Sequence, residues 1–196
     1  HERLVGSEMC IRDSLMTGKT SARHRVTNWT AVNAPTLNEY SGGLPHIRAP
    51  QWNMAGMSQQ EIPLPRVLKD AGYRTITVGK AHFAPSNQLY SNPANLGFDV
   101  NIAGCSAGQP ASYRGEDQFG SGNTHVPDLE EYYGTTAAED RKRNFLTNAL
   151  TLEMKKQIKA AVDENAPFFA YMTHYAVHQR HDQPDPNGDY DTYPSG

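Results

Sequence analysis

An amphipathic helix pattern runs directly into a short apolar strand pattern twice in this chain. Apolar residues recur at helical spacing over residues 64–71, Gly72 follows as a left-handed C-cap, and residues 73–78 alternate and are rich in β-branched residues. Later, apolar residues recur every four positions over 145–164, and residues 167–172 form an apolar run typical of a strand covered on both faces. Helices that alternate with such strands predict an α/β fold with a mainly parallel sheet flanked by helices.

Long connections separate these units. Residues 84–136 show little periodic pattern and contain many Gly, Ser, Asn and Pro residues. A connection of that length inside a compact domain is uncommon and is usually functional or mobile. The 16 glycines and 13 prolines among 196 residues are nevertheless too few for a disordered low-complexity chain. The composition therefore indicates a globular, loop-rich protein.

Charge and hydropathy exclude several classes of function. The net charge of -3 gives no electrostatic basis for binding nucleic acid or an anionic membrane surface. No apolar run has the length of a membrane span, which is about 18 residues. Two cysteines, Cys10 and Cys105, are too few for a disulfide framework.

Polar residues follow both predicted strands at the sheet edge where ligands bind in open α/β folds. The first strand leads into Lys80 and His82, and the second leads into a histidine-containing segment that ends at His178. In an extended segment Lys80 and His82 point the same way. A fixed cation beside an imidazole suits a substrate that carries an oxyanion, because it neutralises charge and supplies a proton donor.

The same residues have simpler interpretations. Lys80 is also consistent with a solvated lysine at a strand end, and His82 and His178 with ordinary loop or surface histidines. A zinc site built from His174, His178 and His181 lacks a suitably spaced Cys or carboxylate to complete a tetrahedral set. We therefore predict no metal ligands in this chain.

Five strings, taken in order, resemble the type I sulfatases of the alkaline-phosphatase-like superfamily. They lie at residues 15–19, 64–75, 78–82, 97–99 and 167–178. The Gly-Lys-x-His string together with the later His-Tyr-Ala-x-His string is the most specific part. The order and approximate spacing resemble the N-terminal part of that family's catalytic domain, over residues 14–196.

The resemblance implies hydrolysis of sulfate esters through a formylglycine nucleophile, with a calcium ion and basic side chains holding the sulfate. It implies that Lys80 and His178 contact the sulfate, that His178 helps to protonate the leaving oxygen, and that His82 orients the nucleophile. The strings most resemble those of polysaccharide- or glycosaminoglycan-acting sulfatases, which implies a glycan sulfate ester as substrate. Such enzymes are usually exported, so a periplasmic or extracellular location is expected.

The sequence also departs from the family pattern. The family's nucleophilic cysteine lies ten residues before the glycine that matches Gly18, where this chain has Glu8, whereas Arg12 matches the family's arginine. We therefore expect Cys10 to be an unmodified bystander and residues 1–13 to be a doubtful, artefactual segment. The family's calcium ligands match no residue of the chain, so we expect a fragment truncated at both ends, inactive as written, whose complete parent binds calcium.

Two alternatives remain open from the sequence. One is a phosphoesterase or phosphonate hydrolase of the same superfamily, with Ser or Thr as nucleophile. The other is a non-catalytic domain that binds sulfated glycans through aromatic residues such as Trp29, Trp52 and Tyr113.

Overall fold

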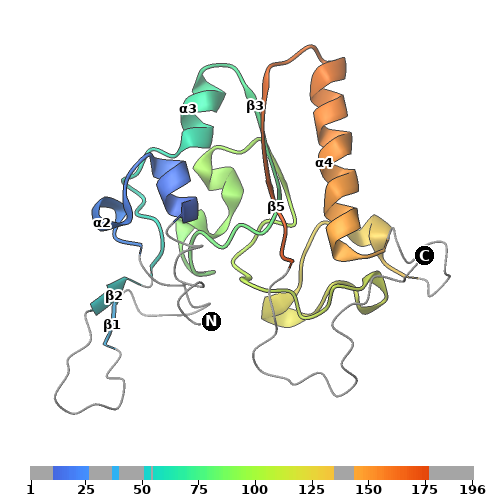
Figure 1. Ribbon diagram of the computed structural model, residues 1–196, viewed down its shortest axis with the longest axis horizontal. Helices are drawn as coiled ribbons and strands as arrows, with labels where there is room; N and C mark the ends of the chain where they lie inside the picture. Colours follow the sequence, from blue (N-terminus) through green and yellow to red (C-terminus); the bar gives the residue numbers. More distant parts are fainter. Residues whose placement is uncertain (1–10, 27–36, 40–50, 54, 135–143, 177–196) are drawn as a thin grey trace.

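A parallel three-stranded sheet forms the centre of the computed structural model, which describes residues 11–26, 37–39, 51–53, 55–134 and 144–176 (Figure 1). The strand order is β4–β3–β5, with bounds Val100–Ile102 for β4, Arg74–Gly79 for β3 and Phe168–Thr173 for β5. Strands β1 (Leu37–Glu39) and β2 (Gln51–Asn53) form a separate antiparallel pair. The predicted α/β class with a mainly parallel sheet is confirmed.

Both predicted helix–strand units are present. Helix α3 (Leu64–Asp70) starts after Pro63, ends at the C-cap Ala71, and turns into β3 through Gly72, whose φ is +86°. Helix α4 (Leu146–Asp163) turns into β5 after the C-cap Glu164. Along their whole length β3 and β5 pair in parallel, from Arg74 opposite Phe168 to Gly79 opposite Thr173. The carboxyl ends of the two strands therefore lie together.

Separate apolar clusters cover the two faces of the sheet. On one face, Ile76 and Val78 of β3 are fully buried in a cluster with Leu146 and Leu150 of α4. The second cluster includes Met16, Phe83 and Phe98, and Phe169 and Tyr171 of β5 pack against it. In Figure 1, α4 and α3 accordingly lie on opposite sides of the strands. The sheet is thus the middle layer of three.

Strand β5 has apolar neighbours on both faces, as its composition predicts, yet most of its side chains are only partly buried. Ala170 and Met172 pack against one cluster, and Phe169 and Tyr171 against the other. Phe168 is 37% exposed. Within the described residues β5 pairs with β3 alone, so its second edge has no strand against it.

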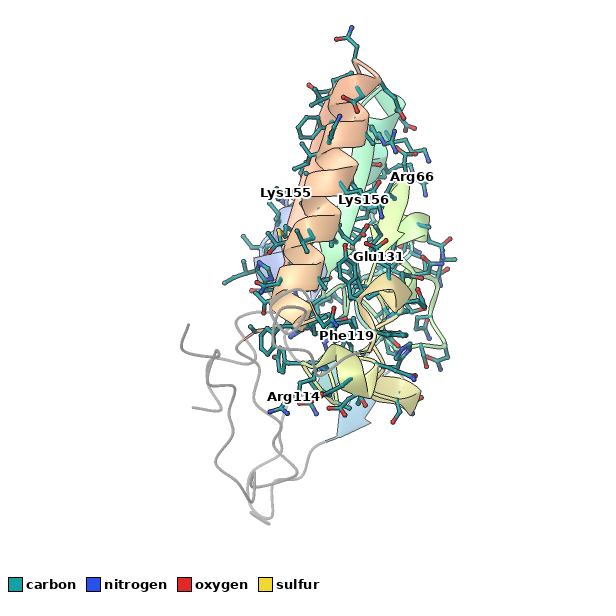
Figure 2. The ribbon with its side chains drawn as sticks, turned by 90° about the vertical axis from the view of Figure 1, so that its right-hand side faces the viewer. Arg66, Arg114, Phe119, Glu131, Lys155 and Lys156 are labelled. Atoms are coloured by element: carbon teal, nitrogen blue, oxygen red, sulfur yellow. The ribbon has the colours of Figure 1, made fainter. Side chains whose placement is uncertain are left out.

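The long connection is more ordered than its composition suggests. It contains β4 and five short 3-10 helices, which are η1 (Leu89–Ser91), η2 (Pro93–Leu96), η3 (Gly115–Asp117), η4 (Gly122–Thr124) and η5 (Glu130–Tyr132). Figure 2 shows Glu131 beside Lys156 of α4, and the Lys156 ammonium lies 3.1 Å from carboxylate oxygens of both Glu131 and Glu153. The Tyr132 hydroxyl donates to Glu153 (2.8 Å). Contacts with α4 therefore hold this part of the connection in place.

The remaining helices of the described part are short: one covers residues 11–17 and α2 covers Ser21–His24. Among the helices that the structure describes, none combines the length and the apolar character needed to cross a membrane.

Candidate active site

The chain that leaves β3 is tied to the end of β5 at Lys80. The Lys80 amide N–H donates to the Thr173 carbonyl oxygen (2.9 Å), and the Thr173 hydroxyl donates to the Lys80 carbonyl oxygen (2.6 Å). Gly79 permits this approach, because its φ is +106° and a β-carbon there would lie 1.8 Å from the Thr173 carbonyl oxygen. The position of the Lys80 backbone is therefore set by two strands at once.

Lys80 and His82 are both buried, with exposed fractions of 3% and 7%. The simpler interpretation of Lys80 as a solvated lysine at a strand end is therefore wrong. Burying an ammonium group costs free energy unless other groups compensate it. Lys80 lies just after the carboxyl end of the central strand. In open α/β sheets this is where ligands bind.

His82 follows a turn and does not continue the strand. Its φ is +50°, in the left-handed region, and its amide N–H donates to the Cys105 carbonyl oxygen (2.9 Å). We predicted that Lys80 and His82 point the same way because the segment is extended. That premise is wrong: β3 ends at Gly79, and the backbone has positive φ at both Gly79 and His82.

Arg12 also belongs to this region. One of its guanidinium nitrogens donates to the carbonyl oxygen of Ala81 (2.9 Å), the residue between Lys80 and His82, and Arg12 is only 6% exposed. The helix over residues 11–17 thus brings a third basic side chain to the end of β3. Two cationic side chains and an imidazole are therefore buried at one strand end, a composition that suits an anionic group.

Sequence reasoning placed Arg12 only through the family resemblance and did not include it among the site residues. Its distance of 69 residues from Ala81 in the sequence gives no local signal. Its position six residues before Gly18, which matches the arginine of the family pattern, is the one feature that pointed to it.

Asp13, the neighbour of Arg12, is a buried carboxyl group. It is 0% exposed, and neither carboxylate oxygen has a hydrogen-bond partner within the described part of the chain. Burial raises the pKa of Asp13 to about 7, although the Arg12 guanidinium opposes that rise. The charge beside Arg12 therefore changes near neutral pH.

The segment after β5 contributes a buried tyrosine. The Tyr175 hydroxyl donates to the Ala103 carbonyl oxygen (2.9 Å) and lies 3.9 Å from the Cys105 sulfur. Burial raises the pKa values of the Tyr175 hydroxyl and the Cys105 thiol, so both groups are protonated at neutral pH. These contacts join the ends of β4 and β5 beside His82.

The histidines after β5 are only partly described. His174 is exposed. His178, His181 and Cys10 lie outside the described residues, so the predicted roles of His178 and Cys10 stay predictions.

The calcium ion implied by the resemblance has no fitting site in the part of the chain that the structure describes. There, no three His, Cys, Asp or Glu side chains come together as a possible metal ligand set. Asp13, a buried carboxyl group, stands beside Arg12, which would repel a cation. We therefore derive no step through a metal ion.

Replacing Thr173 with valine tests the link between the two strand ends. Valine keeps the shape of threonine but removes the hydroxyl that donates to the Lys80 carbonyl oxygen. We expect the free energy of unfolding to fall by about 1 kcal/mol, the usual net contribution of such a hydrogen bond. Urea denaturation measures the change.

Thr151→Val is the matched control, because the Thr151 hydroxyl makes the same kind of bond to the Thr147 carbonyl oxygen (2.8 Å) but on the exposed side of α4. It should change stability by less than about 0.5 kcal/mol. Equal losses in the two variants would show that the Thr173 hydroxyl does not hold the strand ends together.

Comparison with known protein families gives one match that extends over nearly the whole chain. The model of the Sulfatase family matches residues 8–196. Human steryl-sulfatase (Homo sapiens) is 26% identical over 121 residues, which cover 55% of this chain and 18% of that protein. The chain therefore spans about a fifth of the length of this relative.

Similar solved structures share the fold. The crystal structure of Ps i-CgsB has a TM-score of 0.55 and 19% identity, covering 92% of this chain and 38% of that one. A complex of Ps i-CgsB with k-i-k-neocarrahexaose gives a TM-score of 0.53 and 21% identity, covering 91% and 38%. The PsFucS1 sulfatase from Pseudoalteromonas sp. gives 0.50 and 18%, covering 91% and 36%. At these identities the likeness establishes the arrangement of the sheet and helices, over less than two fifths of the length of each solved chain.

Proposed function

Because this chain belongs to the Sulfatase family, we propose that the protein containing it is a hydrolase of sulfate esters. The burial of Lys80 and His82 at the carboxyl end of β3, with Arg12 bound to the residue between them, is the observation that carries the proposal. Residues 14–196 would form part of the catalytic domain. The alkaline-phosphatase-like arrangement of the sheet is consistent with this assignment.

The basic residues supply the chemistry that sulfate-ester cleavage needs. Negative charge on the sulfuryl oxygens and on the leaving oxygen must be stabilised by groups already in position. Lys80 would neutralise the sulfuryl oxygens, with Arg12 adding to the positive environment. His82 would orient the attacking group, and His178 would donate a proton to the leaving oxygen.

The nucleophile and the metal ion that the family resemblance implies are assigned to the complete protein. A formylglycine nucleophile and a calcium ion belong to the same proposal, but we assign neither to a residue of this chain. Cys10 lies outside the described residues, and the described residues hold no calcium ligand set. The steps proposed here therefore use only Arg12, Lys80, His82 and His178.

For the substrate, we propose a sulfated polysaccharide or oligosaccharide. The sequence strings favour this class, and one structural neighbour was solved with an oligosaccharide, k-i-k-neocarrahexaose. A periplasmic or extracellular location fits such a substrate, and this location also stays a prediction.

The test is turnover by the complete protein that contains this chain. We expect it to release sulfate, but not phosphate, from matched nitrophenyl esters and from a sulfated oligosaccharide. Lys80→Met, which keeps the length of the side chain but removes its charge, should lower kcat/KM at least about tenfold, because electrostatic groups of this kind commonly contribute more than that.

The control is Lys159→Met on the exposed face of α4, where Lys159 pairs with Asp163 (2.5 Å). It should leave turnover unchanged. Release of phosphate without sulfate would replace the proposal with a phosphoesterase. If the protein binds the glycan without any turnover, and Lys80→Met still binds it, the chain is part of a non-catalytic binding domain and the proposal is wrong.

A further inference from the structure

The turn that follows β4 lies directly against His82. The His82 amide N–H donates to the Cys105 carbonyl oxygen (2.9 Å). Three residues later, a β-carbon at Gly108 would lie 2.6 Å from Cε1 of the imidazole and 2.8 Å from Nδ1. The backbone of this turn therefore contacts both the main chain and the nitrogen-bearing edge of the histidine ring.

Several hydrogen bonds hold the turn in place. The Asn101 side chain donates to the Gly104 carbonyl oxygen (2.9 Å), and the Tyr175 hydroxyl donates to the Ala103 carbonyl oxygen (2.9 Å). The Ala107 amide N–H donates to the Cys105 sulfur (3.4 Å). Strand β4 and the segment after β5 thus fix the turn from both sides. The turn therefore forms a rigid surface against which the His82 imidazole packs.

Backbone conformation does not explain the glycine at position 108. Several glycines of this chain have positive φ, among them Gly79, Gly97 and Gly120, but Gly108 is outside that group. A left-handed backbone is therefore not the reason for a glycine at this position. A side chain at position 108 would have no space, because the imidazole of His82 already occupies that volume.

We propose that Gly108 is a positioning residue that fixes the orientation of the His82 imidazole. Its missing side chain lets the 105–108 backbone lie against the ring, while the Cys105 carbonyl oxygen holds the left-handed backbone of His82. The catalytic meaning of this contact rests on the proposed function. A histidine that orients or protonates a reacting group must keep its ring nitrogens in place, and small displacements cost large factors in rate.

Gly108→Ala tests the contact without using activity. In the ¹⁵N-histidine-labelled chain, long-range ¹H–¹⁵N spectra show each imidazole, and His82→Asn identifies the His82 signals by their loss. We expect Gly108→Ala to move the His82 ring signals, because the added methyl group must displace the imidazole. Gly122→Ala should not move them, because a β-carbon at Gly122 meets no atom within 4 Å.

In the complete protein, the same variant should lower kcat for sulfate-ester hydrolysis at least about tenfold and change KM less than about threefold, because it displaces a group that acts in the reaction step. Unchanged His82 signals in Gly108→Ala would overturn the inference. Moved signals in a protein that hydrolyses no sulfate ester would support the contact and reject the proposed function instead.

A Gly108→Ala chain that fails to fold still gives a result. His82→Asn shortens the side chain, and asparagine tolerates the left-handed backbone. The double variant His82→Asn/Gly108→Ala should then recover a cooperative urea transition with at least half of the lost stability. If the double variant stays unfolded, the clash is not with His82 and the proposal is wrong.

Discussion

Replacing Gly79 with alanine is expected to lower the free energy of unfolding by more than about 3 kcal/mol, or to prevent folding. Two independent costs coincide at this position. The φ of +106° disfavours any residue with a β-carbon, and that carbon would lie 1.8 Å from the Thr173 carbonyl oxygen. Relief requires β3 and β5 to separate where Thr173 makes its two hydrogen bonds with the Lys80 backbone.

Gly72→Ala separates the two costs. Gly72 also has positive φ, at +86°, but a β-carbon there would meet no atom within 4 Å. We expect a loss of about 1–2 kcal/mol from the backbone conformation alone. Urea denaturation of both variants measures the difference, and equal losses would mean that β3 and β5 do not approach as closely as described here.

Replacing Asp13 with asparagine is expected to raise stability above pH 7, by up to about 4 kcal/mol, and to have little effect near pH 4. Burial raises the pKa of Asp13 to about 7 in the folded protein, from an ordinary value of 3.8. A group with a raised folded pKa contributes stability below its unfolded pKa and loses that contribution as the pH rises through the folded value. Wild-type stability should therefore fall between about pH 4 and pH 7 in a way that the asparagine variant does not.

The measurement is the difference in free energy of unfolding between the two proteins at several pH values, since other titrating groups cancel in that difference. Asp70→Asn is the matched control, because it makes the same substitution at an exposed position, at the end of α3. A difference for Asp13→Asn that does not vary between pH 4 and pH 8 would show that folding does not raise the pKa of Asp13.

The elements with local signals could be predicted. The apolar spacing over 64–71 and 145–164 and the apolar strands that follow correspond to α3, α4, β3 and β5 within a residue or two. Their signals are visible because the spacing of apolar residues is a local property of the chain, even though α3 buries only Pro65 and β5 is only partly buried. Strand β4 was missed, since three residues are too few to show a period.

The candidate site could be predicted only in part. Lys80 and His82 were proposed as site residues because polar residues after a buried strand stand at the ligand-binding edge of the sheet. Their surroundings could not be, because Arg12, Cys105 and Gly108 come from distant segments whose contacts with residues 81 and 82 form only in the folded chain. The assumption of an extended backbone failed where Gly79 and His82 turn.

By itself, then, the sequence determined the class of fold, the family, and the strand end at which the basic residues lie. Those properties depend on periodic burial and on short strings, both of which are local in the chain. The tertiary structure alone decided that Lys80 is buried and that Thr173 holds the Lys80 backbone. It also decided that Gly108, 26 residues away, lies against the His82 imidazole. Such contacts depend on which strand ends meet, and only the packing of the complete sheet sets that.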